Sequence, residues 1–275
     1  MPDTQRQDKA QIIAALRDEM QSRGLDALIV PRFDAHQGEY VAPHDQRLKF
    51  VTGFSGSAGM AIVTPDTVAV FVDGRYTVQI ANECSGALFS HFHLFDEAPD
   101  VWLGNVAQQG WRIGFDPMHL PPSWYDRFNK GCVASQAELV PQPANPVDVI
   151  WHDQPASPKR TISPFSMQFA GKSSADKNAA LQARLKEEGA QFHVETQPDN
   201  IAWFLNVRGD DVNFNPMPHS FMLVSETGDV TWCVDDSKFE AGLQESLPDH
   251  VSVVGHELFL ATLKSEVGRS EEHTS

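Results

Sequence analysis

The chain has 275 residues, of which 41% are hydrophobic and 21% charged, and its formal net charge is −16. No run approaches the roughly 20 apolar residues that a membrane-spanning helix requires, so the sequence predicts no membrane partner. The 37 acidic residues outnumber the 21 Lys and Arg, and this excess would repel phosphates, so no nucleic-acid partner is expected either.

The N-terminal residues and the cysteines both predict a cytoplasmic protein. The first eleven residues, MPDTQRQDKAQ, are polar and lack the apolar core of a signal peptide. Cys84, Cys132 and Cys233 are an odd number at wide spacing. This pattern is typical of free thiols in a reducing compartment.

The first predicted elements are a helix and a strand. Four apolar residues recur at helical spacing over residues 8–24, where Gly24 ends the helix: Ile12, Ile13, Leu16 and Met20. Residues 27–30 follow as a short buried strand. Two runs rich in β-branched residues, 60–64 and 67–72, are separated by Pro65-Asp66 and therefore predict a hairpin.

Three glycines precede this hairpin at every third position, in the motif GFSGSAG: Gly53, Gly56 and Gly59. A residue without a Cβ lets the backbone turn sharply or approach another surface closely. The spacing matches neither a phosphate-binding loop nor, with Ser at position 57, the nucleophile elbow of a hydrolase. The glycines therefore indicate a structural role.

The rest of the first half predicts a mixed sheet flanked by helices. Helices are expected over residues 76–84, 98–109 and 122–129, and strands near 87–94 and over 112–115. Three tryptophans are predicted to pack in the core: Trp102, Trp111 and Trp124. His91 and His93 would share one face of a strand, but no third ligand stands at metal-binding spacing, so a structural role is favoured.

Four prolines between residues 145 and 164 predict a domain boundary, because proline interrupts both helix and sheet. The second half then repeats the plan of the first. A helix over 173–188 is ended by Gly189, a strand over 192–195 follows, and a hairpin joins strands at 221–225 and 230–234. A strand over 251–254 and a helix from Glu257 come last.

Four motifs resemble those of one enzyme family. DAHQGEYVAPHDQR, GFSGSAG and DGRY occur in order in the first half, and NIAWFLNVRGDDVNFNP occurs in the second. Together they resemble the N-terminal region of the long, three-domain Xaa-Pro aminopeptidases, relatives of creatinase and prolidase, from about residue 10 to 264. One departure is Pro218-His219, where the family has a proline and an aromatic residue. Trp203, Phe204 and Leu205 are expected in the core.

The resemblance implies an α/β fold of two tandem creatinase/prolidase N-terminal-like domains, each a mixed sheet flanked by helices in a ribonuclease H-like motif. Domain boundaries are expected at 1–155 and 156–268, with the second domain incomplete. The last seven residues, RSEEHTS, resemble the translation of a DNA-sequencing adapter. We therefore expect residues 269–275 to be a non-native tail that packs against nothing, with a native disordered tail as the alternative.

The family removes the N-terminal residue from peptides that have proline in second position, with two divalent metal ions, usually manganese. The resemblance implies that their five ligands lie in a C-terminal pita-bread domain beyond this chain. Asp199 and Asp210 have the spacing that opens the family's metal motif, but no Gly-rich segment, His or pair of Glu completes it. The chain is therefore predicted to bind no metal, to contain no catalytic residue and to be inactive alone.

By residue-wise transfer, Arg75 of DGRY is the candidate substrate-binding residue, and Asp34, His36 and Gln37 are weaker candidates near the same opening. The resemblance further implies a homodimer in which this region supports dimerisation and shapes the substrate entrance. Two alternatives stay open. The chain could belong to a creatinase or prolidase relative with another small substrate, or to a non-catalytic module that binds peptides or proteins.

Overall fold

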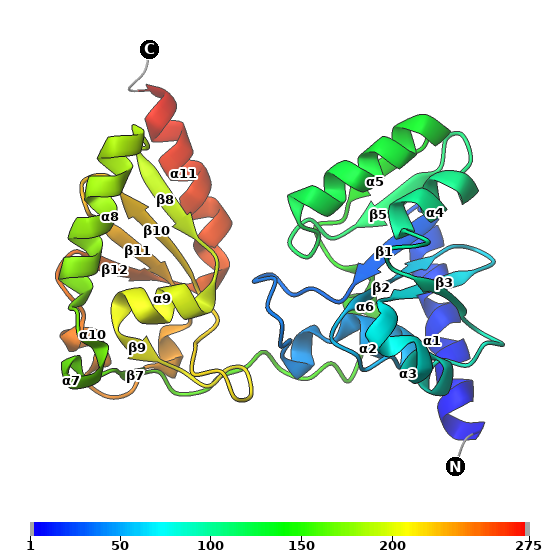
Figure 1. Cartoon of the computed structure of the whole chain (residues 1–275), viewed down its shortest axis with the longest axis horizontal. Helices are drawn as coiled ribbons and strands as arrows, with labels where there is room; N and C mark the ends of the chain where they lie inside the picture. The colour runs from blue at the N-terminus through cyan, green and yellow to red at the C-terminus, as the bar shows by residue number, and fades with distance from the viewer. Residues whose placement is uncertain (1–2, 273–275) are drawn as a thin grey trace. The chain divides into compact units, whose positions relative to one another are not determined.

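The computed structural model describes the backbone of residues 3–272 and the side chains of residues 9–266. The chain divides into two compact units, residues 1–156 and 157–275, called domain I and domain II below. Figure 1 shows that each unit is a β-sheet with helices packed against it. The predicted mixed α/β architecture is therefore confirmed in both halves.

Domain I is built on a six-stranded sheet in the order β4-β3-β2-β1-β5-β6. The pairs β1–β2 and β2–β3 are antiparallel, and the other neighbours are parallel. The predicted hairpin is confirmed, because Gly59 pairs with Val72 and Val63 with Val68. The strands are β1 (Ala27–Pro31), β2 (Gly59–Val63), β3 (Val68–Val72), β4 (Ser90–His93), β5 (Arg112–Phe115) and β6 (Glu138–Pro141).

Helices cover both faces of this sheet (Figure 1). Successive strand residues point to opposite sides, so Leu28 and Val30 pack with α1, α2, α3 and α6, whereas Ile29 packs with α4 and α5. Burying one such aliphatic side chain contributes about 1.5–3 kcal/mol. The helices are α1 (Asp3–Ser22), α2 (Arg47–Thr52), α3 (Thr77–Glu83), α4 (Pro99–Val106), α5 (Pro122–Ser135) and α6 (Pro146–Ile150).

Several predicted boundaries in domain I are wrong. Helix α5 continues past Asn129 and contains Gly131, where α4 passes so close that a Cβ would lie 2.9 Å from the Asp100 carbonyl oxygen. The prolines between residues 145 and 164 were expected to interrupt helix and sheet, yet the short helix α6 begins at Pro146. Proline is accepted there because the first amide of a helix needs no partner, and the Asn145 side chain caps the turn through Val147 N.

Domain II has a four-stranded sheet in the order β12-β11-β10-β8, in which only β11 and β12 run parallel. Its strands are β8 (Phe192–Glu195), β10 (Phe221–Ser225), β11 (Val230–Cys233) and β12 (Val251–Val254), and β7 (Ser163–Pro164) pairs separately with β9 (Val207–Arg208). Its helices are α7 (Met167–Ala170), α8 (Ser174–Glu188), α9 (Pro198–Leu205), α10 (Leu243–Ser246) and α11 (Phe259–Glu272).

The two domains repeat one plan, as the sequence predicts. In domain I, α1 and β1 precede the β2–β3 hairpin, and a 3₁₀ turn and α3 lead to β4, which lies parallel to β3. In domain II, α8 and β8 precede the β10–β11 hairpin, and a 3₁₀ turn and α10 lead to β12, parallel to β11. The plans differ beside the first strand. Strand β1 lies between β2 and β5, whereas β8 pairs only with β10 and forms the edge of its sheet within residues 3–272.

The NIAWFLN segment forms α9, and one of its three predicted core residues is not in the core. Phe204 and Leu205 are 4% exposed, but Trp203 is 54% exposed because it lies on the outer face of the helix, where the Lys177 ammonium sits 4.4 Å from its ring centre. His219, at the departure from the family pattern, is buried. The neighbouring Pro218 packs so tightly on Gly209 that a Cβ there would lie 2.9 Å from it.

Helix α11 continues to Glu272 without a break at Arg269. The side chains beyond residue 266 and all of residues 273–275 lie outside the described part, so the hypothesis that RSEEHTS packs against nothing stays a prediction. Elsewhere in the described chain, no helix has the length and apolar character needed to cross a bilayer.

Candidate functional site

Arg75, the main candidate from sequence, lies in the short 3₁₀ turn Gly74–Tyr76 that follows β3. Asp73 caps this turn by accepting a hydrogen bond from Arg75 N at 2.9 Å. The same carboxylate accepts hydrogen bonds from Nε and Nη2 of the Arg75 guanidinium, and the bond from Nη2 is 2.7 Å long. Hydrogen bonding to Arg75 holds the pKa of Asp73 below its usual value, and the same contact raises the pKa of Arg75. The side chain is 65% exposed. The guanidinium is therefore held by Asp73 through Nε and Nη2, while much of the side chain stays exposed.

Tyr76 links this turn to the glycine motif. Its hydroxyl lies 2.6 Å from Ser57 Oγ, and its ring meets Phe54 edge to face at 5.6 Å between centroids. A Cβ on Gly56 would clash with Phe54 and lie 2.8 Å from Tyr76 Cδ1. The hydrogen bond from Ser57 lowers the pKa of the Tyr76 phenol. The middle glycine of GFSGSAG is thus required for close packing beneath the aromatic residue next to Arg75.

Helix α3 holds the other end of the glycine motif. Ser55 donates from its backbone N at 2.8 Å and from Oγ at 2.6 Å to the two carboxylate oxygens of Glu83, and Gln79 also donates to Glu83. Burial raises the pKa of Glu83, but the hydrogen bonds from Ser55 and Gln79 outweigh it, and on balance the pKa is lowered. The loop is therefore fixed at both ends, by Tyr76 and by Glu83.

The weaker candidates shape a loop. Asp34 is 1% exposed, and its Oδ1 accepts hydrogen bonds from the backbone N of His36 and of Gly38, each at 3.0 Å. Gln37 has a positive φ of 56° and donates from its side chain to the Asp34 carbonyl. His36 is 4% exposed. These contacts explain the DAHQ motif as a turn built on a buried aspartate, and a substrate contact by these residues stays a prediction.

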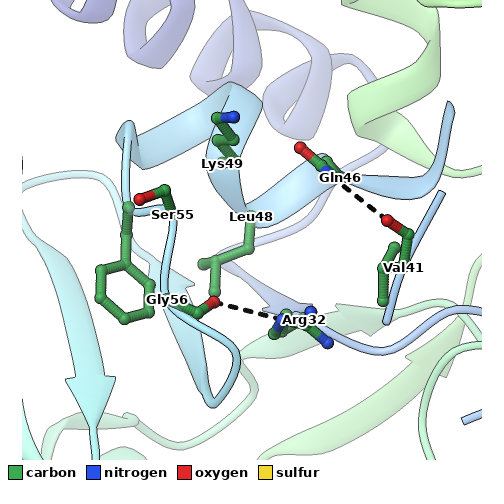
Figure 2. A pocket seen from close by; sticks show the side chains of 8 residues that line it. Arg32, Val41, Gln46, Leu48, Lys49, Ser55 and Gly56 are labelled. Atoms are coloured by element: carbon green, nitrogen blue, oxygen red, sulfur yellow. Dashed lines mark hydrogen bonds between the residues drawn. The ribbon is translucent and has the colours of Figure 1, made fainter. Parts of the chain in front are cut away.

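A residue that the sequence analysis did not single out, Arg32, lines a small pocket of about 80 Å³ in domain I (Figure 2). Apolar walls come from Val41, Leu48 and Phe54, and polar groups from Arg32, Gln46, Lys49, Ser55 and Gly56. Arg32 Nε donates to the Gly56 carbonyl at 3.2 Å. One sequence signal was available. Arg32 follows directly after the fully buried strand β1, and an arginine next to a buried strand is unusual because this residue is mostly exposed in proteins.

The histidines and aspartates considered as metal ligands do not assemble. His91 and His93 are half-buried on β4, and His93 Nδ1 is engaged by Asp96, 2.9 Å from Oδ2. Asp199 lies in the first turn of α9 and Asp210 is exposed. No group of three or more His, Cys, Asp or Glu in the described part of the chain has the arrangement to hold a metal ion.

Comparison with known proteins matches both halves to one domain family. The creatinase/prolidase N-terminal domain matches residues 12–148, and a second form of the same domain matches residues 153–273. Aminopeptidase P1 of Lotus japonicus is 35% identical over 240 residues, which cover 86% of this chain and 36% of the relative. A probable Xaa-Pro aminopeptidase P of Ajellomyces dermatitidis is 34% identical over 249 residues, covering 90% of this chain and 40% of the relative.

Among solved structures, the X-prolyl aminopeptidase of Caenorhabditis elegans superposes with a TM-score of 0.89 and 25% identity. The match covers 97% of this chain and 45% of that enzyme, which is described as cytosolic with a di-nuclear active site. The chain therefore spans less than half the length of each of these relatives.

Proposed function

We propose that this chain, which belongs to the creatinase/prolidase N-terminal domain family and carries that domain twice, is the N-terminal region of a metal-dependent Xaa-Pro aminopeptidase. The observation that carries the proposal is the superposition of nearly the whole chain on an X-prolyl aminopeptidase at a TM-score of 0.89. The parent enzyme would remove the first residue from peptides with proline in second position. It would act in the cytoplasm as a homodimer.

In this proposal the chain's own residues bind and orient rather than catalyse. Asp73 holds the Arg75 guanidinium through Nε and Nη2 in a side chain that is 65% exposed, an arrangement suited to binding a carbonyl or carboxylate of a peptide. Tyr76 and the clamped GFSGSAG loop hold the turn that carries it. Asp34, His36 and Gln37 would shape the same opening from the neighbouring loop. Domain I would thus form part of the substrate entrance, and the region would support dimerisation.

The two divalent metal ions that the family uses, manganese in this proposal, do not fit the residues that the structure describes. The described residues offer no cluster of three or more carboxylate, imidazole or thiolate ligands, whereas a two-metal site needs several such donors around both ions. The ions therefore belong to a catalytic domain elsewhere in the parent protein. This chain carries no catalytic residue in the proposal.

The experiment that tests the function compares this chain with the longer gene product that contains it. With manganese present, the longer protein should release the first residue from an Xaa-Pro peptide such as Arg-Pro-Pro, and the 275-residue chain should release none. Metal-dependent hydrolysis by the isolated chain would contradict the proposal. So would a longer protein that is folded and dimeric but cleaves no peptide with proline in second position.

A further inference from the structure

The pocket in Figure 2 contains a guanidinium group that is only partly engaged. Arginine has five N–H donors. In Arg32 the Nε–H is taken by the Gly56 carbonyl, and the two terminal nitrogens donate to no other residue in the described part of the chain. Neither terminal nitrogen of Arg32 is among the buried side-chain atoms that lack a partner, so their four N–H groups are accessible from outside. These donors are therefore available to an external acceptor.

The residues that line the pocket carry only positive charge. Burial lowers the pKa of Arg32, and the more distant charges of Asp34, Tyr76 and Glu39 act in the opposite direction without forming an ion pair with it. None of the eight residues that line the pocket is acidic, and Lys49 adds a second positive charge at its edge. Glu83 lies near Lys49 but is occupied by Ser55 and Gln79.

The shape of the pocket limits the kind of anion. A guanidinium fork presents two parallel N–H groups, which match the two oxygens of a carboxylate. The lining also includes three apolar side chains, those of Val41, Leu48 and Phe54, and the volume of about 80 Å³ leaves room for only a few atoms. A phosphate dianion would lose hydration against these side chains without a second buried cation to compensate. A carboxylate with a short aliphatic substituent meets both surfaces.

We propose that this pocket is a carboxylate-binding site, in which the terminal nitrogens of Arg32 hold the carboxylate and the aliphatic substituent packs on Val41, Leu48 and Phe54. The carboxylate could be the C-terminus of a peptide or that of a free short-chain acid, since both present the same group. The site lies wholly in domain I, and the inference does not depend on the proposed peptidase function.

The test is a titration of the ¹⁵N-labelled chain followed by NMR, with sodium propionate as the first probe. The amide signals of Ser55 and Gly56 should shift and saturate in the millimolar range. Arg32→Gln should raise the half-saturation concentration about tenfold or more, because a charged hydrogen bond is lost. Arg17→Gln is the matched control, since Arg17 is also partly buried in domain I and also donates Nε to a backbone carbonyl, that of Thr64 at 2.9 Å. It should leave propionate binding unchanged.

A second pair of probes identifies the source of the carboxylate. If the peptide Ala-Pro-Ala shifts the same signals and its C-terminal amide does not, the site takes a peptide C-terminus. If propionate binds and neither peptide does, the site takes a free acid. Both results support the pocket, and because no hydrolysis is measured they stay distinct from any failure of the proposed function.

Three results would overturn the inference: no saturable shift with propionate or Ala-Pro-Ala, equal weakening by Arg17→Gln and Arg32→Gln, or displacement of propionate by an equal concentration of inorganic phosphate. Arg32→Lys provides a second variant in case Arg32→Gln does not fold, with thermal melting as the check. A lysine at position 32 keeps the positive charge but lacks the two parallel N–H groups of the guanidinium, so propionate binding should weaken severalfold. Unchanged binding in Arg32→Lys would also contradict the proposal.

Discussion

The two domains end the second strand of their hairpins in the same way but with different side chains. In domain I, Asp73 caps the turn after β3 through Arg75 N, and in domain II, Asp235 caps the turn after β11 through Ser237 N. The position of Arg75 is taken by Ser237, and Asp235 pairs instead with Lys159. The same capped turn therefore forms in domain II with a serine in place of the arginine, so capping by aspartate does not depend on Arg75.

The domains also differ in how completely their sheets are covered. The domain I sheet has an extended apolar cluster on each face, with Phe71 in one and Val70 in the other. In domain II one large cluster includes Met222 and Trp232. Phe221 points to the opposite face, where its ring stacks on Phe259 of α11 with centroids 4.1 Å apart. Every residue of β1 is buried, whereas every residue of β8 is half-exposed. We expect domain II to open more readily.

The largest predicted effect is at a buried ion pair in domain II. The Asp211 side chain is 0% exposed and accepts from Lys238 Nζ at 2.9 Å, from His219 N at 2.8 Å and from Arg160 N at 3.2 Å. Asp211→Ala leaves a buried ammonium and two amides without this acceptor. The free energy of unfolding should fall by about 3–5 kcal/mol, as measured by urea denaturation.

Domain I offers a matched comparison for this ion pair. Asp148 pairs with Arg47, but its side chain is 33% exposed and Arg47 keeps a second partner, Asp45. Asp148→Ala should therefore cost clearly less than Asp211→Ala. The double variant Asp211→Ala/Lys238→Met should recover part of the loss, because no buried charge is left unpaired. Equal costs at Asp148 and Asp211 would contradict this account of the pair.

A second prediction uses the three cysteines as probes of local opening. Burial raises the pKa of Cys84, Cys132 and Cys233 to about 11, so at pH 8 the native thiols should not react with a disulfide reagent. Cys84 and Cys132 lie in the two domain I clusters, and Cys233 lies on β11 of domain II. In single-cysteine variants, Cys233 should be labelled at lower urea concentrations than the other two. Coincident labelling of all three would show that domain II is not the weaker unit.

The smallest predicted effect is at Trp232, the largest fully buried side chain. Its Nε1 is buried and donates to no acceptor among the described residues, and its ring stacks on Phe239 with centroids 5.2 Å apart. Trp232→Phe removes an unsatisfied donor along with some packing volume, and these terms oppose each other. The free energy of unfolding should change by less than about 1 kcal/mol. A loss above about 2 kcal/mol would mean that the indole N–H has a partner.

Sequence reasoning recovered the elements whose pattern is local. The two β-branched runs in residues 60–72 and the helical spacing of Ile13, Leu16 and Met20 each follow from local sequence, and both predictions are confirmed. Gly131 inside α5 could not be predicted, because the reason for it is the backbone of α4, which lies elsewhere in the sequence. Trp203 was assigned to the core although a helix has an outer face as well.

The candidate site divides in the same way. Asp73 and Arg75 are two residues apart in a turn, so their pairing was accessible from sequence, although the substrate role of Arg75 stays a prediction. The pocket at Arg32 joins residues from three separate segments around positions 32, 41–49 and 54–56. No spacing rule connects such segments, because their distance depends on how α2 packs against β1 and β2. The pocket therefore required the folded structure.

The most direct test of the central claim is a kinetic comparison of Arg75→Ala with Arg127→Ala in the proposed parent enzyme. Arg127 is a matched control, since it is an exposed domain I arginine that pairs with Asp100 and stacks on Trp124. We predict that Arg75→Ala lowers kcat/KM for an Xaa-Pro peptide by about tenfold to hundredfold with an unchanged Tm, and that Arg127→Ala leaves kcat/KM unchanged. Unchanged kinetics with a lowered Tm in Arg75→Ala would contradict the claim and make Arg75 a structural residue.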